Sequence, residues 1–289
     1  MISGIFNDIQ NNLNETIIGT SQINIGYVND VFFIQTNYDK YILKCFNIID
    51  QPKIDLSIAL QKYLSTKNLS PDIVYEGIYG SHYILQRYVD NEIMSNDLFL
   101  FGKTLGLIHY NFRTYDDSNI KDFSFSENSL ENKKSLSKEC YELILLKNNI
   151  KHMVHCPQLE QKQLIHGDYT WNNILKKKNE YQVIDFDEAK KYYAIYDVSK
   201  VVFDLIFTQK NAWEDINKFL YGYQNICHIS KQEKKEFLNI YAYTLMNDCS
   251  ILYDNLNKDN HFVQKRINRH KDIIRCFDEY DEIRRRIYL

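Results

Sequence analysis

The segment from His166 to Asp187 holds the residues whose types and spacing best suit a chemical reaction. Asp168, in the sequence HGDYTWNN, can accept a hydrogen bond from a hydroxyl group, and Asn173, five positions later, offers a neutral oxygen to a metal ion. Asp185 ends a short apolar run, so a strand would deliver its carboxylate rigidly, and magnesium prefers such hard oxygen donors. Phosphoryl transfer needs an oriented hydroxyl, bound metal and positive groups near the phosphates. The segment therefore predicts phosphoryl transfer.

A lysine much earlier in the chain would supply the positive charge. Lys44 lies in the sequence YILKCF, between apolar neighbours. Half-burying an ammonium group is costly unless it faces an anion. The alternative is an exposed strand lysine whose aliphatic stem covers apolar surface. We expect Lys44 to face the phosphates of a nucleotide.

Three further residues of the central segment each have two interpretations. We expect His166 to hold the backbone of the loop by hydrogen bonds and not to act as a base. Asp187 either helps to bind metal or substrate, or caps the segment that follows it. Trp171 either stacks on the substrate or belongs to the core.

The motif HGDxxxxN followed by IDFD resembles the aminoglycoside phosphotransferase and choline kinase superfamily, which includes bacterial homoserine-kinase-like and spore-coat kinase-like members. The resemblance implies a protein-kinase-like fold and a kinase that uses Mg²⁺ and ATP or GTP. It also implies that Asp168 orients the acceptor hydroxyl, that Asn173 and Asp185 hold magnesium, and that Lys44 meets the phosphates. A lone HGD would carry little weight, but these positions at these spacings rarely coincide by chance.

The resemblance extends from residue 20 to about residue 205. Gly26, in the sequence IGYVN, is similar to the family's short nucleotide-covering loop. Gln86 and Tyr88 fall where the family's hinge presents backbone groups to adenine. Asp197, in the sequence YDV, resembles the later aspartate that braces the catalytic loop.

One departure from the family concerns the helix that follows the lysine strand. The family usually has a glutamate there, paired with the strand lysine, whereas this chain has Ser57, with Asp55 as the nearest carboxylate. This motivates an alternative function, a catalytically weak or inactive nucleotide-binding coat or scaffold protein of the same fold. A protein kinase is disfavoured, because no APE-like stretch follows IDFD.

The elements around these residues are strands first and helices later. Residues 15–46 alternate short β-rich runs with turns, which predicts an antiparallel hairpin or meander. Apolar residues at helical spacing predict a helix over 55–67, and the run HYILQRYV at 82–89 predicts a strand. Ser230 followed by Glu233 predicts a capping box that opens a later helix.

This order predicts an α+β fold with two lobes. Residues 1–90 would form a small antiparallel N-lobe with one helix, which covers the nucleotide. Residues 91–289 would form a larger helical C-lobe, with the catalytic loop and the substrate-binding region.

Composition excludes several classes of partner. The net charge of −3 gives no broad positive field for nucleic acid. The 6 cysteines are scattered without a CxxC pair, which indicates reduced thiols in the cytoplasm. The chain has neither a signal-peptide pattern nor a long apolar run, so we expect no membrane partner. The expected partners are a nucleoside triphosphate and a small-molecule hydroxyl acceptor, and mild acidity favours an amine-bearing one, such as an aminoglycoside or a choline-like metabolite.

Overall fold

The computed structural model describes residues 2–23, 29–47, 50–90, 97–123, 144–146, 148–149, 151, 154–159, 161–177, 179–208, 212–256, 275–276 and 279–287. The chain divides into two compact units. The first comprises Met1–Asp97 and Trp171–Ala189, and the second comprises Leu98–Thr170 and Lys190–Leu289. Strands dominate the first unit and helices the second, so the α+β class is confirmed.

The first unit is built on a five-stranded antiparallel sheet with the order β1-β2-β3-β5-β4. Its strands are β1 (Ile17–Gln22), β2 (Asp30–Thr36), β3 (Lys40–Cys45), β4 (Ile73–Tyr79) and β5 (Ser81–Arg87). The meander expected over residues 15–46 is confirmed. Lys44 lies in β3, opposite Val31 of β2 and Ile84 of β5, so it is held by strands on both sides.

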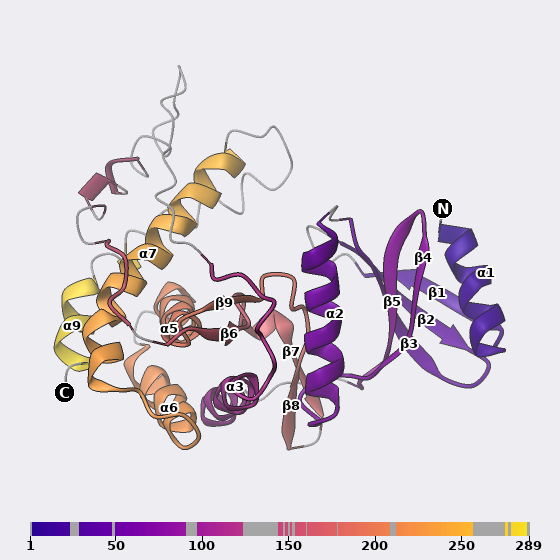
Figure 1. Cartoon of the computed structure of the whole chain (residues 1–289), viewed down its shortest axis with the longest axis horizontal. Helices are drawn as coiled ribbons and strands as arrows, with labels where there is room; N and C mark the ends of the chain where they lie inside the picture. Colours follow the sequence, from indigo (N-terminus) through magenta and orange to yellow (C-terminus); the bar gives the residue numbers. More distant parts are fainter. Residues whose placement is uncertain are drawn as a thin grey trace. The chain divides into compact units, whose positions relative to one another are not determined.

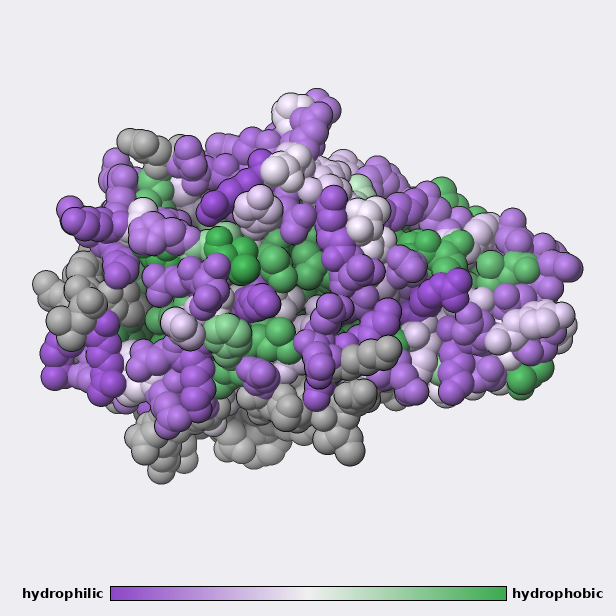
Figure 2. Space-filling view, turned by 90° about the horizontal axis from the view of Figure 1, so that it is seen from below, coloured by the Kyte–Doolittle hydropathy of each residue, from purple (hydrophilic) through white to green (hydrophobic). Residues whose placement is uncertain are grey.

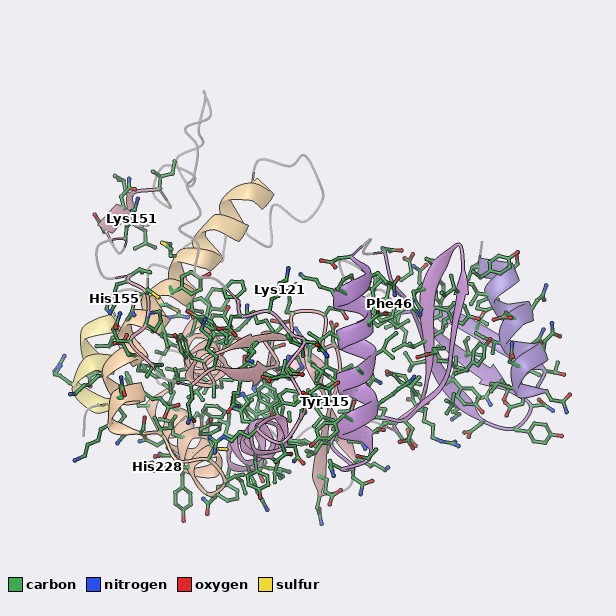
Figure 3. The ribbon with its side chains drawn as sticks, viewed as in Figure 1. Phe46, Tyr115, Lys121, Lys151, His155 and His228 are labelled. Atoms are coloured by element: carbon green, nitrogen blue, oxygen red, sulfur yellow. The ribbon has the colours of Figure 1, made fainter. Side chains whose placement is uncertain are left out.

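Two helices lie on opposite faces of this sheet, α1 (Ile2–Leu13) and α2 (Gln51–Ser65) (Figure 1). Alternate residues of a strand point to opposite faces. The α1 face buries one apolar cluster, made by Ile5, Ile9, Ile34, Tyr41, Leu43, Cys45, Tyr83 and Leu85. The α2 face buries another, made by Phe46, Ile54, Ile58 and Ile84, of which Phe46 is labelled in Figure 3. Lys44 follows Leu43 and therefore belongs to the α2 face.

Helix α2 begins earlier than the pattern of apolar residues predicts. The side chain of Asp50 accepts a hydrogen bond from the backbone of Lys53, and Pro52 stands in the first turn. Both features favour a helix start, because a carboxylate satisfies an unpaired N–H group and proline needs none. The helix therefore starts at Gln51 and not at Asp55.

A short hairpin after residue 170 belongs to the first unit. The 3-10 turn η1 (Trp171–Asn173) leads into β7 (Ile174–Lys177), which pairs with β8 (Glu180–Val183). The N–H of Val183 donates to the Leu69 carbonyl at 2.8 Å, and the Ser70 hydroxyl donates to the Val183 carbonyl at 2.7 Å. These bonds fix the hairpin beside the segment that follows α2. The division into lobes at residues 90 and 91 stays a prediction.

The second unit contains most of the described helices. They are α3 (Leu98–Phe112), α5 (Ile195–Thr208), α6 (Trp213–Gln224), α7 (Lys231–Leu256) and α9 (Tyr280–Ile287), together with a short sheet of β6 (Gln163–Ile165) and β9 (Lys190–Tyr192). The capping box at the start of α7 is confirmed. The Ser230 N–H donates to the Glu233 carboxylate at 2.8 Å, and the Glu233 N–H donates to the Ser230 hydroxyl at 3.1 Å.

Most of the buried side chains in the described part of the chain are apolar. In Figure 2, polar residues cover most of the visible face, and apolar residues occur in small groups. None of the helices in the described ranges combines the length and the apolar character needed to cross a bilayer.

Candidate active site

Asn173 and Asp185 lie at the same end of the β7–β8 hairpin. Ile174 pairs with Val183, and the N–H of Ile184 donates to the Asn173 carbonyl at 3.0 Å. Asn173, just before β7, and Asp185, two residues after β8, therefore lie next to the same end of the paired strands. Asp185 has a φ of 68°, which places it in the left-handed region that non-glycine residues seldom adopt. Such conformations cost free energy and gather at functional sites.

The ammonium group of Lys44 binds both aspartates of the IDFD motif. Its Nζ lies 2.8 Å from Oδ1 of Asp185 and 2.8 Å from Oδ1 of Asp187. It also lies 4.9 Å from the centre of the Phe46 ring, a cation–π distance. The Lys44 side chain is 12% exposed. The ammonium group of Lys44 is thus largely buried and paired with two protein carboxylates, and its contact with nucleotide phosphates stays a prediction.

Asp187 has two further hydrogen-bond donors. The Ser57 hydroxyl of α2 donates to Oδ1 at 2.8 Å, and the Asn29 amide donates to Oδ2 at 2.6 Å. Burial alone would raise the pKa of Asp187, but Lys44, Ser57 and Asn29 outweigh burial and hold the pKa below its ordinary value. Asp55 is exposed and accepts from Gln51 instead.

A different carboxylate, Asp197 of α5, organises the HGD loop in the second unit. The N–H of His166 donates to Oδ2 at 2.8 Å, the N–H of Gly167 donates to Oδ1 at 2.9 Å, and His109 Nε2 lies 3.1 Å from Oδ2. Gly167 has a φ of 80°, which explains the glycine of the motif. Asp197 is fully buried, and its hydrogen bonds outweigh burial and lower its pKa.

Asp168 follows directly after this fixed backbone. Its own N–H donates to Nδ1 of the buried His166 at 3.2 Å, so His166 holds the loop through its ring as well as its backbone. The carboxylate of Asp168 is 37% exposed, and Oδ1 lies 2.6 Å from Nζ of Lys200. An acidic side chain on a rigid loop, partly open to solvent, can orient a hydroxyl group.

The sequence prediction gave no role to Lys200 or to Asn29, although Asn29 ends the sequence IGYVN. A signal for Lys200 was present, because it follows Asp197 by three positions, and residues at this spacing share a helix face. A helix that offers Asp197 to the loop therefore offers Lys200 to the same loop. Asn29 gave no local signal, since its partner Asp187 is 158 residues away.

The remaining predicted residues of the first unit have structural partners. Trp171 is partly exposed in η1, and its ring meets that of Tyr181 edge to face, with centroids 6.0 Å apart. Gln86 is buried, and its Oε1 accepts from the Gln61 amide at 2.7 Å. These contacts do not assign a ligand to either residue, so the roles at Trp171 and Gln86 stay predictions.

Tyr88 and Gly26 complete the predicted nucleotide set. The N–H of Tyr88 donates to the Lys40 carbonyl at 3.1 Å, and its ring packs against Phe33. The backbone N–H of Tyr88 is thus already used within the sheet. Gly26 lies outside the described residues.

Asp185 and Asn173 offer hard oxygen donors of the kind that magnesium prefers. Within the described ranges, no group of three or more His, Cys, Asp or Glu side chains could hold a metal ion. Magnesium is usually bound by one or two carboxylates, with water and phosphate oxygens completing its octahedron. The carboxylate of Asp185 is 44% exposed, and Asn173 adds an amide oxygen on the same hairpin. These residues fit that requirement.

Comparison with known protein families identifies the class of this chain. Residues 19–225 match the phosphotransferase enzyme family. This match covers more than half of the chain, so the protein belongs to the phosphotransferase enzyme family, and its enzyme class is that of the small-molecule kinases. A comparison with curated proteins found no match.

Solved structures support the fold. Spectinomycin phosphotransferase APH(9)-Ia, with ADP and spectinomycin, has a TM-score of 0.67 at 14% identity, covering 99% of this chain and 98% of that chain. The microcompartment-associated aminopropanol kinase has a TM-score of 0.67 at 14% sequence identity, and the match covers 97% of this chain and 99% of that chain. Choline kinase LicA from Streptococcus pneumoniae has a TM-score of 0.62 at 12% sequence identity, and the match covers 96% of this chain and 98% of that chain. The protein-kinase-like fold expected from the sequence is confirmed.

Proposed function

We propose that this protein transfers the γ-phosphoryl group of ATP or GTP to a hydroxyl group of a small molecule. The observation that carries the proposal is that Lys44 of β3 lies between the carboxylates of Asp185 and Asp187. These two aspartates follow directly after the β7–β8 hairpin, and Asn173 precedes it. When a nucleotide binds, phosphate oxygens can replace one of these two carboxylates as the ion-pair partner of Lys44. The family match over residues 19–225 supports the same reaction class.

The proposed roles follow from the chemistry of each group. Asp185 and Asn173 would hold Mg²⁺, which supplies positive charge to the phosphate oxygens of the bound nucleotide. Lys44 would neutralise further phosphate charge. Asp168 would be the catalytic residue that accepts a hydrogen bond from the acceptor hydroxyl, on a loop that Asp197 and His166 hold in place. Gly26, Gln86 and Tyr88 would contribute to nucleotide binding.

The proposed acceptor is a small hydroxyl compound that also carries an amine. Aminopropanol kinase and choline kinase, both similar in fold to this chain, are named after nitrogen-containing alcohols. The net charge of −3 weakly favours a cation over an anion as substrate.

A thermal-shift measurement with Mg-ATP and Mg-GTP tests the nucleotide site. A ligand present at a hundred times its dissociation constant stabilises the folded state by about 2.7 kcal/mol. We expect a metal-dependent rise in melting temperature for the wild type and its loss in Asp185→Asn. No shift with either nucleotide at millimolar concentration would refute the proposal.

The alternative, an inactive nucleotide-binding coat or scaffold protein, is favoured by Ser57 at the position where the family usually has glutamate. Phosphate transfer to a panel of amino alcohols and aminoglycosides distinguishes the two. Turnover that Asp168→Ala abolishes would support the kinase. Nucleotide binding with no transfer to any acceptor would support the scaffold.

A further inference from the structure

The two carboxylates that bind Lys44 differ in the number of hydrogen-bond donors that they already have and in their exposure to solvent. Both oxygens of Asp187 have donors, because Oδ1 accepts from Lys44 and Ser57 and Oδ2 accepts from Asn29. Asp185 binds Lys44 through Oδ1. The Asp187 side chain is 12% exposed, and that of Asp185 is 44% exposed. Asp185 is therefore the carboxylate with room for a further ligand.

We propose that Asp187 is a positioning residue, which keeps Lys44 in place for the nucleotide phosphates and is itself held by Ser57 and Asn29. The inference rests on the proposed function. The inference also explains Ser57, which stands where α2 lacks a carboxylate. Ser57 donates a hydrogen bond to Asp187, and Asp187 supplies the negative charge that pairs with Lys44.

The geometry distinguishes this role from the two roles expected from the sequence. A cap would use the Asp187 carboxylate on a backbone N–H group of the following turn, whereas its hydrogen bonds in the described part of the chain go to side chains of β3, α2 and the segment before β2. A metal ligand needs a free lone pair directed at the ion, whereas three of the about four acceptor positions of this carboxylate already accept hydrogen bonds from protein donors. An anchor for Lys44 explains all three contacts.

The surroundings of Lys44 strengthen this anchor. Phe46, which is labelled in Figure 3, belongs to the α2 face of the sheet, and the centre of its ring lies 4.9 Å from Nζ of Lys44. An ion pair against an apolar ring is less screened than one in water. When a ligand binds to Asp185 and breaks its ion pair with Lys44, the ion pair between Lys44 and Asp187 remains and holds the ammonium group in position.

A double-mutant cycle on nucleotide affinity tests the inference. We expect Asp187→Asn and Lys44→Met each to weaken Mg-ATP binding about tenfold, and the double variant to bind no more weakly than Lys44→Met, because Asp187 acts through Lys44. The Mg²⁺ concentration for half-maximal binding should stay unchanged in Asp187→Asn and rise in Asp185→Asn. A full effect of Asp187→Asn in the Lys44→Met background, with a higher Mg²⁺ requirement, would make Asp187 a metal ligand and overturn the inference.

A rescue experiment adds a readout that a purely structural role would not affect. Ser57→Glu, introduced into Asp187→Asn, returns a carboxylate to the helix, and we expect it to recover most of the lost affinity. Ser57→Ala alone should weaken binding less than Asp187→Asn, and Ser65→Ala, the same change at the end of α2, should leave it unaltered. Failure of Ser57→Glu to improve Asp187→Asn would count against the inference.

Failure of the proposed function gives a separate result. A wild type that binds neither Mg-ATP nor Mg-GTP refutes the kinase but leaves the ion pair measurable. In that case the melting-temperature shifts of Lys44→Met and Asp187→Asn should be strongly non-additive, more so than those of Lys44→Met and Asp185→Asn. Additive shifts for the first pair would overturn the anchor itself.

Discussion

In the first unit the carboxylates of Asp185 and Asp187 hold a side chain, the ammonium group of Lys44, whereas in the second unit the carboxylate of Asp197 holds two backbone N–H groups together with the ring of His109. The Lys44 side chain is 12% exposed and that of Asp185 is 44% exposed, while Asp197 and His109 are both at 0%. A partly open ion pair can exchange a partner for a ligand. A closed network of hydrogen bonds to N–H groups fixes the shape of a loop, so the first arrangement suits binding and the second suits positioning.

The sharpest test of this comparison is the removal of Asp197. Asp197→Ala leaves the N–H groups of His166 and Gly167 and the ring of His109 without their buried partner, and breaking such a network costs about 3–5 kcal/mol. The free energy of unfolding in urea measures the loss. Glu214→Ala, which removes an acidic side chain that is 80% exposed, is the control and should change stability by less than about 0.5 kcal/mol. Equal effects would show that the second unit does not depend on its buried carboxylate.

A second test concerns the helices that support this network. A Cβ atom on Gly222 would clash with the carbonyl oxygen of Phe99 in α3, and backbone cannot move aside cheaply. The next residue, Tyr223, contacts Nδ1 of His109 through its hydroxyl at 2.9 Å. We expect Gly222→Ala to lower the free energy of unfolding by about 1–3 kcal/mol, because overpacking forces backbone shifts.

The same substitution in the first unit is the control for Gly222. A Cβ atom on Gly19 would meet Gln35 at 3.8 Å, an ordinary contact. Gly19→Ala should therefore be nearly neutral in the same urea titration. A neutral result for Gly222→Ala as well would mean that α3 and α6 can separate without disturbing the second unit.

The pH dependence of stability should also report on Asp197. Its folded-state pKa lies below the ordinary value of 3.8, so the unfolded chain binds the proton first as the pH falls. The stabilisation by Asp197 is therefore fully present above about pH 5 and is lost as the pH falls through the lowered folded-state pKa. The difference in unfolding free energy between wild type and Asp197→Asn should be constant from pH 5 to pH 7 and shrink below about pH 4. A difference that grows on acidification would reverse the sign of this pKa shift.

Local patterns in the sequence predicted the elements, because the physics involved is local. The period-two pattern over residues 15–46 gave the meander, and the pair Ser230 and Glu233 gave the start of α7. Helix α1 was not predicted, although Ile5 and Ile9, four positions apart, become its buried face. The signal for this helix is present in the sequence, because residues four positions apart share a helix face.

The site was predictable only in part for a related reason. The motif named Asp185 and the strand named Lys44, but their contact joins residues 141 positions apart and depends on the fold. The contact of Ser57 with Asp187 spans 130 positions, and no pattern in either segment predicts it. Residue types thus indicate the chemistry, whereas the partners follow from how the sheet, α2 and the hairpin pack.

The smallest expected effect compares two ion pairs of the first unit that differ in burial. Lys62 and Glu76 are 2.6 Å apart, closer than Lys44 and Asp187 at 2.8 Å, but their side chains are 48% and 44% exposed. Exposed pairs are screened by water and salt, so Lys62→Ala should lower stability by no more than about 0.5 kcal/mol. Urea titrations of Lys62→Ala and Asp187→Asn at ionic strengths of about 0.1 M and about 0.5 M make the comparison. If the shorter pair had the larger effect, distance and not burial would determine the strength of these interactions, and the contrast between Asp185 and Asp187 would lose its basis.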